Sequence, residues 1–68
     1  MMTPALAPDD ALRVARWLVN AANEQSAYAN EPGHSRESAF CLRFHASGLR
    51  MKAIDALEAA GLTWEDLR

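Results

Sequence analysis

The chain has 68 residues, of which half are hydrophobic and 24% are charged, and its formal net charge at pH 7 is −2. A chain of this length forms one domain at most, and it buries so little surface that a disulfide, a metal or a partner chain is usually needed to stabilise it. The single cysteine, Cys41, excludes an internal disulfide, and the acidic balance argues against general binding to polyanions.

The N-terminal segment, residues 1–7, is expected to form a flexible arm ahead of the first helix. It has no basic cluster and no long apolar run, so it does not resemble a secretory signal. No stretch of the chain approaches the length of a membrane span, so no membrane association is expected. These features predict a cytoplasmic protein in which Cys41 stays reduced.

The first helix is expected to begin at Pro8 and to run to about Asn30. Proline is favoured at the first helical position, and Asp9 and Asp10 place negative charge at the positive end of the helix dipole. The following sequence EPGHS, residues 31–35, contains strong helix breakers. Abundant alanine and few β-branched residues favour helix throughout, so no strand is expected.

At 100° per residue, the polar residues of this first helix share one narrow side. The rest of its circumference is mostly apolar and carries Leu12, Val14, Ala15, Trp17, Leu18, Val19, Ala21, Ala22 and Tyr28. One partner helix cannot cover so wide an arc. The width of this apolar arc therefore predicts that the first helix packs against more than one neighbour.

The second helix is expected to follow Ser35 as its N-cap, to run to about Ala60 and to close at Gly61. It has two apolar faces, separated by thin polar seams. One face holds Ala39, Leu42, Ala46, Leu49, Ala53, Leu57 and Ala60, and the other holds Phe40, Cys41, Phe44, Gly48 and Met51. A helix that is apolar on two sides needs two neighbours, and which face meets which neighbour stays open at this point.

A second copy of the chain is the simplest source of the second neighbour. The expected fold is therefore all-α: a helical hairpin of two long helices plus a short C-terminal helical turn, spanning 8–68 as a single helical domain and forming a homodimeric four-helix bundle. The residues expected at the dimer interface are Phe40, Phe44, Met51, Trp17 and Tyr28.

The sequence GLTWEDLR at the C-terminus raises the question of a helix-turn-helix. Thr63 and Asp66 resemble a capping box, and one helical turn follows. A recognition helix needs several side chains that face the bases, whereas this turn is short and carries acidic Glu65 and Asp66. We therefore expect a helix stop and a capped turn whose Leu62 and Leu67 fold back on the hairpin.

Three arginines, Arg36, Arg43 and Arg50, recur every seven residues and share one stripe of the second helix. They could bind phosphates or an acidic protein surface, or they could form an ordinary solvated edge that pairs with Glu and Asp of the first helix or of a second copy. Residues 36–52 carry a net charge of +3 and residues 53–68 carry −3, so a partner could recognise either end.

Cys41 and His45 are four residues apart and therefore neighbours on one helix face. A metal site needs three or four ligands, so a packed thiol beside a polar seam is the preferred interpretation, and neither a metal nor another cofactor is expected. No phosphate loop, zinc-protease motif or nucleophile elbow occurs, so an enzyme is not expected. Trp64 either holds the tail on the hairpin or contacts a partner.

The favoured function is a small non-enzymatic inhibitor or adaptor that sterically blocks a larger host protein, of the phage-encoded anti-defence, anti-CRISPR-like or anti-activator type. Its expected partner-binding residues are Arg36, Arg43, Arg50, Trp64, Glu65 and Asp66. The alternative is a small DNA-linked transcriptional regulator or antitoxin that acts as a dimer, although direct nucleic-acid binding is not favoured. The inhibitor hypothesis rests on the kind of protein this is: very small, acidic and without a catalytic motif. The regulator hypothesis rests on the arginine stripe.

Overall fold

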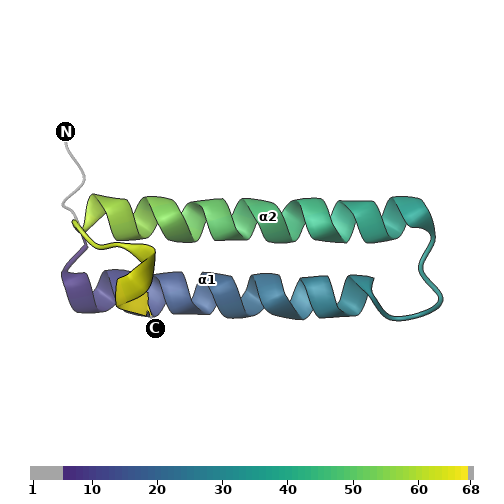
Figure 1. Ribbon diagram of the computed structural model, residues 1–68, viewed down its shortest axis with the longest axis horizontal. Coiled ribbons are helices and arrows are strands. Elements are labelled where there is room, and N and C mark those ends of the chain that lie inside the picture. The colour runs from purple at the N-terminus through teal and green to yellow at the C-terminus, as the bar shows by residue number, and fades with distance from the viewer. Residues whose placement is uncertain (1–5, 68) are drawn as a thin grey trace.

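The protein is a hairpin of two antiparallel helices, α1 (Pro8–Ala29) and α2 (Arg36–Ala59), followed by one 3-10 turn, η1 (Trp64–Leu67) (Figure 1). The computed structural model describes residues 6–67. The predicted all-helical hairpin with a short C-terminal helical turn is confirmed. Most of the predicted arm, residues 1–5, and Arg68 lie outside the described residues.

The bounds of α1 follow from the residues at its two ends. Pro8 occupies the first turn together with Asp9 and Asp10, as the sequence predicts. No side chain caps this end, and the carbonyl of Ala7 accepts the first helical hydrogen bond. At the other end the chain turns through Gly33, whose φ of 101° is open to glycine but strained for other residues.

Both ends of α2 are capped as the sequence predicts. Ser35 Oγ accepts a hydrogen bond from the backbone N–H of Ser38 at 3.1 Å. At the C-terminus Gly61 has a φ of 72°, and the N–H of Leu62 reaches back to the carbonyl of Leu57 at 2.8 Å. This pair of features is a Schellman motif, which satisfies the last carbonyls of the helix and ends it.

The contact between α1 and α2 is made largely of alanine. The buried residues are Ala11, Ala15, Ala22 and Ala29 of α1 and Ala46, Ala53 and Leu57 of α2. Small side chains let two helices approach closely, but each of them buries little apolar surface. The structure also settles which apolar face of α2 meets α1: it is the face that carries Ala46, Ala53 and Leu57.

The C-terminal tail closes one end of this contact. Leu62 and Leu67 pack against the cluster formed by Ala15, Ala53 and Leu57, which confirms the predicted fold-back of both leucines. In Figure 1 η1 lies across α1 near the end at which α1 begins. The tail therefore adds apolar contacts to a core that the two helices alone would form from their facing side chains.

The turn itself is held by Asp66. Its Oδ2 accepts from the backbone N–H of Thr63 at 2.7 Å and from the hydroxyl of Thr63 at 3.2 Å. The predicted capping box is therefore present in one direction only, because the hydroxyl donates to the carboxylate and does not accept from a backbone N–H. Arg16 adds a hydrogen bond of 3.3 Å to the carbonyl of Leu67.

Candidate interaction surfaces

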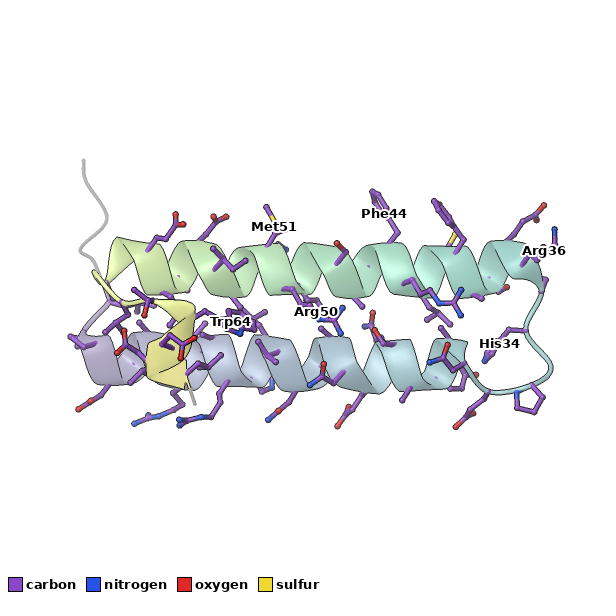
Figure 2. The ribbon with its side chains drawn as sticks, viewed as in Figure 1. His34, Arg36, Phe44, Arg50, Met51 and Trp64 are labelled. Atoms are coloured by element: carbon purple, nitrogen blue, oxygen red, sulfur yellow. The ribbon has the colours of Figure 1, made fainter. Side chains whose placement is uncertain are left out.

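The second apolar face of α2 is open to solvent. Phe40, Phe44 and Met51 are 66%, 72% and 58% exposed, and we refer to these three residues as the α2 ridge. Figure 2 shows Phe44 and Met51 projecting from α2 on the side away from α1. The rings of Phe40 and Phe44 stack with centroids 6.2 Å apart. Among residues 6–67, no other helix therefore covers this row of large apolar side chains.

A second exposed group lies on α1. It consists of Val14, Trp17 and Tyr28, which we call the α1 patch, and Trp17 is 69% exposed. Trp17 and Tyr28 are eleven residues apart, which is about three helical turns, so they share one stripe. Tyr28 meets the ring of His34 edge to face at a centroid distance of 4.4 Å. The patch therefore extends toward the connection between the helices.

The α2 ridge and the α1 patch face different directions. At 100° per residue, Phe44 lies about 160° around α2 from buried Ala46, and Trp17 lies about 140° around α1 from buried Ala22. Each group is therefore on the outer side of its own helix. The five residues predicted for one dimer interface form two separate groups, and their contact with a second chain stays a prediction.

Two of the three predicted stripe arginines bind α1. Arg43 donates to Asn30 Oδ1 at 2.9 Å, and Arg50 donates to Asn23 Oδ1 at 3.1 Å and to Ser26 Oγ at 3.2 Å. Figure 2 shows Arg50 directed toward α1, whereas Arg36 stands at the start of α2. Pairing with Glu and Asp was predicted for this edge, whereas the acceptors of Arg43 and Arg50 on the first helix and its C-cap are amides and a hydroxyl. A role for the stripe in partner binding stays a prediction.

Trp64 borders a hollow at the end of the hairpin where the tail folds back, opposite the connection between the helices (Figure 1). The hollow is lined by Ile54, Leu57, Glu58, Leu62, Thr63 and Trp64. Trp64 is 43% exposed, so it both contributes to the hollow and remains open to a partner. The sequence did not reveal this hollow because it forms only when the tail folds back on α2.

A second hollow lies at the other end, beside the α1 patch. It is lined by Tyr28, His34, Glu37, Ser38, Cys41 and Leu42. His45, the predicted neighbour of Cys41, is hydrogen-bonded through Nδ1 to Gln25 Oε1 at 2.7 Å. In the part of the chain that the structure describes, no group of three or more His, Cys, Asp or Glu side chains is arranged to hold a metal ion.

No protein-family model, curated protein or solved structure matches this chain. Within residues 6–67, neither helix has an apolar stretch of the length needed to traverse a bilayer. The exposed surfaces of the hairpin are therefore the features that bear on its function.

Proposed function

We propose that the protein is a non-enzymatic helical homodimer that binds a larger protein and blocks one of its surfaces. The observation that carries the proposal is the inverted distribution of side-chain size. Among residues 6–67, six of the seven buried core residues are alanine, whereas Trp17, Phe40 and Phe44 are each at least 66% exposed. Large apolar side chains gathered on the outside of a small domain mark sites of protein interaction.

The exposed apolar residues could contribute substantial binding energy to an interface. Full burial of a large apolar side chain contributes roughly 1.5–3 kcal/mol, so three such residues offer several kcal/mol to an interface. The alanine contact between the helices gains much less for each residue that it orders. A second chain on one of the two exposed groups would supply the stabilisation that a chain of this length usually needs.

The two groups support two different contacts. The α2 ridge is the proposed contact with a second copy of the chain. The α1 patch and Trp64, with neighbouring Glu65, remain for the larger protein. Steric occupation is the mechanism that such a chain can offer, since rigid aromatic side chains fill a pocket of the target at a low entropic cost. The predicted phage setting stays a prediction.

The dimer is tested by light scattering on the wild type and on Phe44→Glu. The wild type is expected at about 15 kDa, twice the 7.5 kDa of one chain, and the variant at the monomer mass. A charge placed in a buried apolar contact is strongly unfavourable, whereas the same charge on an open helix face is not. Retention of helical circular dichroism by Phe44→Glu would show that the loss concerns association and not folding.

The partner contact is tested by affinity capture from cells of the source organism, followed by reconstitution with the purified captured protein. Trp17→Ala and Trp64→Ala are expected to weaken the complex, one of them by at least about tenfold, because truncating an aromatic anchor removes a hot spot. Ala27→Gln is the matched control, since Ala27 is exposed on α1 outside the patch. A complex that neither tryptophan variant weakens would contradict the proposal. Salt-sensitive retention of duplex DNA, lost in Arg43→Ala, would instead favour the DNA-linked regulator.

A further inference from the structure

We infer that the second copy packs on the α2 ridge in the antiparallel direction, with Phe44 of each chain seated over Gly48 of the other. This arrangement rests on the homodimer of the proposed function and adds the face, the direction and the register of the contact. Four observations carry it: the open ridge, the position of Gly48, the spacing of the ridge residues and the order of charges along α2.

Gly48 is unexplained by the hairpin alone. It lies in the middle of α2, where glycine destabilises a helix relative to alanine. Positive φ angles are found at Gly33 and Gly61 and not at Gly48, so the backbone does not require glycine here. A Cβ added at Gly48 would have nothing within 4 Å. Close approach by a group from outside the hairpin accounts for a residue without a side chain at this position.

The spacing along the ridge fits an antiparallel copy. Phe44 and Gly48 are one helical turn apart, so each phenyl ring can occupy the gap above the glycine of the other helix. The same register brings Phe40 of one chain beside Met51 of the other. Phenyl rings and thioethers pack favourably, and both side chains are exposed in the single hairpin. The whole ridge is then covered by its own twin.

The charges that border the ridge favour the same direction. In this register Arg36 lies within one turn of Asp55 and Glu58 of the second copy, and Glu37 lies within one turn of Lys52. A parallel pair would instead place the carboxylate of Asp55 against that of its twin, since Asp55 lies close to the middle of the outer side of α2. Antiparallel pairing leaves one contact between like charges, because Glu37 also lies opposite Asp55 of the second copy, with Lys52 one turn away. A parallel pair would instead set every charge against its own twin, so the antiparallel direction carries less repulsion.

Disulfide trapping tests the register. In the antiparallel pair Cys41 lies opposite Met51 of the second copy, while the two Cys41 residues are ten positions apart, about 15 Å along the axis. Met51→Cys should therefore form a covalent dimer within minutes of mild oxidation, linked from Cys41 to position 51 in peptide mapping. Wild type should form at least about tenfold less, because a disulfide requires Cα atoms within about 7 Å. Ala59→Cys is the matched control, exposed on the same side of α2 but two turns farther on.

Each outcome of the trapping decides the question. Rapid linking of Cys41 to Cys41 in the wild type would show a parallel pair or an antiparallel pair centred on Cys41, and either one overturns the inferred register and leaves the homodimer intact. A dimer by light scattering that gives no specific link in either protein would place the contact on another face or in another register, and either result overturns the inference. A wild type that is monomeric at every concentration would overturn both this inference and the homodimer on which it rests.

Gly48→Leu provides a second test that does not depend on cysteine chemistry. Leucine favours helix and meets nothing within the hairpin, so circular dichroism should retain or gain helical signal. The added side chain occupies the space of Phe44 from the second copy, and the dissociation constant of the dimer should rise about tenfold or more. Ala27→Leu adds comparable bulk to an exposed position on α1 and should leave the dimer unchanged. An unchanged dissociation constant in Gly48→Leu would overturn the inference.

Discussion

The two apolar faces of α2 differ in almost every respect except hydrophobicity. The inner face places Ala46, Ala53 and Leu57 against α1, and all three are buried. The outer face places Phe40 and Phe44 in solvent. The two faces belong to the same helix and have the same neighbours in sequence, so local propensity does not explain the difference. Instead, side-chain size differs with the surroundings of each face: it is small where the face packs on α1 and large where the face is open to solvent.

The comparison separates the demands of folding from those of binding. Close contact between two helices favours alanine, because a larger side chain would push the backbones apart. A surface that must capture another molecule favours large, rigid side chains, because they bury more area for each residue that becomes ordered. In this hairpin the inner contact fixes the geometry, and we propose that the outer surfaces provide the function.

The largest effect is expected when one residue of each face of α2 is replaced by alanine and the two losses of unfolding free energy are compared. Leu57→Ala should lower the free energy of unfolding by about 2–5 kcal/mol, because it removes the only large side chain of the described core that is fully buried. Phe44→Ala should change it by less than about 0.5 kcal/mol at concentrations where the chain is monomeric, since Phe44 is 72% exposed. Urea unfolding followed by circular dichroism measures both values. Equal losses would mean that Phe44 packs within the single chain.

A smaller effect is expected at the polar edge of the inner contact. Arg50→Ala removes the hydrogen bonds to Asn23 and Ser26 and should lower the free energy of unfolding by about 1 kcal/mol, discounted because the arginine is half-buried. Arg36→Ala is the matched control and should change it by less than about 0.5 kcal/mol, because Arg36 is exposed at the first residue of α2. The same urea titration separates the two variants. A larger loss for Arg36→Ala would show that the stripe stabilises the hairpin at its exposed end.

The arginines also show which features could be predicted from the sequence and which could not. Spacing predicts that Arg36, Arg43 and Arg50 share one side of a helix, because helical periodicity is local. It does not predict that Arg50 reaches Asn23 across the hairpin, since that contact depends on the rotation and axial offset of one helix against the other. The opposed directions of the α1 patch and the α2 ridge could not be predicted from the sequence either, because they also depend on how the two helices are rotated against each other.

Helix ends were predictable because their signals are local. Ser35 caps α2 by accepting a hydrogen bond from the backbone N–H three positions later. The Schellman motif at Gly61 involves only residues within five positions of one another. The hollow beside Trp64 was not predictable, because Ile54 and Trp64 meet only after the tail has turned back. The alanine contact lies between these cases: the sequence separated two apolar faces of α2, and the structure was needed to assign them.

Effects of no more than about 1 kcal/mol, but of opposite sign, are expected at the glycine within α2 and at the glycine that ends it. Gly61 has a φ of 72°, so Gly61→Ala should lower the free energy of unfolding by about 1 kcal/mol through strain at the helix stop. Gly48 has ordinary helical geometry and open space around it, so Gly48→Ala should raise the free energy of unfolding of the monomer by up to about 1 kcal/mol.

The opposite signs matter more than the magnitudes. Thermal unfolding at low protein concentration should place the Gly61 variant below the wild type and the Gly48 variant above it. At high concentration the advantage of Gly48→Ala should shrink or reverse, because the added methyl group then stands in the way of Phe44 from the second copy. A stabilisation by Gly48→Ala that is independent of concentration would mean that no chain approaches α2 at this glycine.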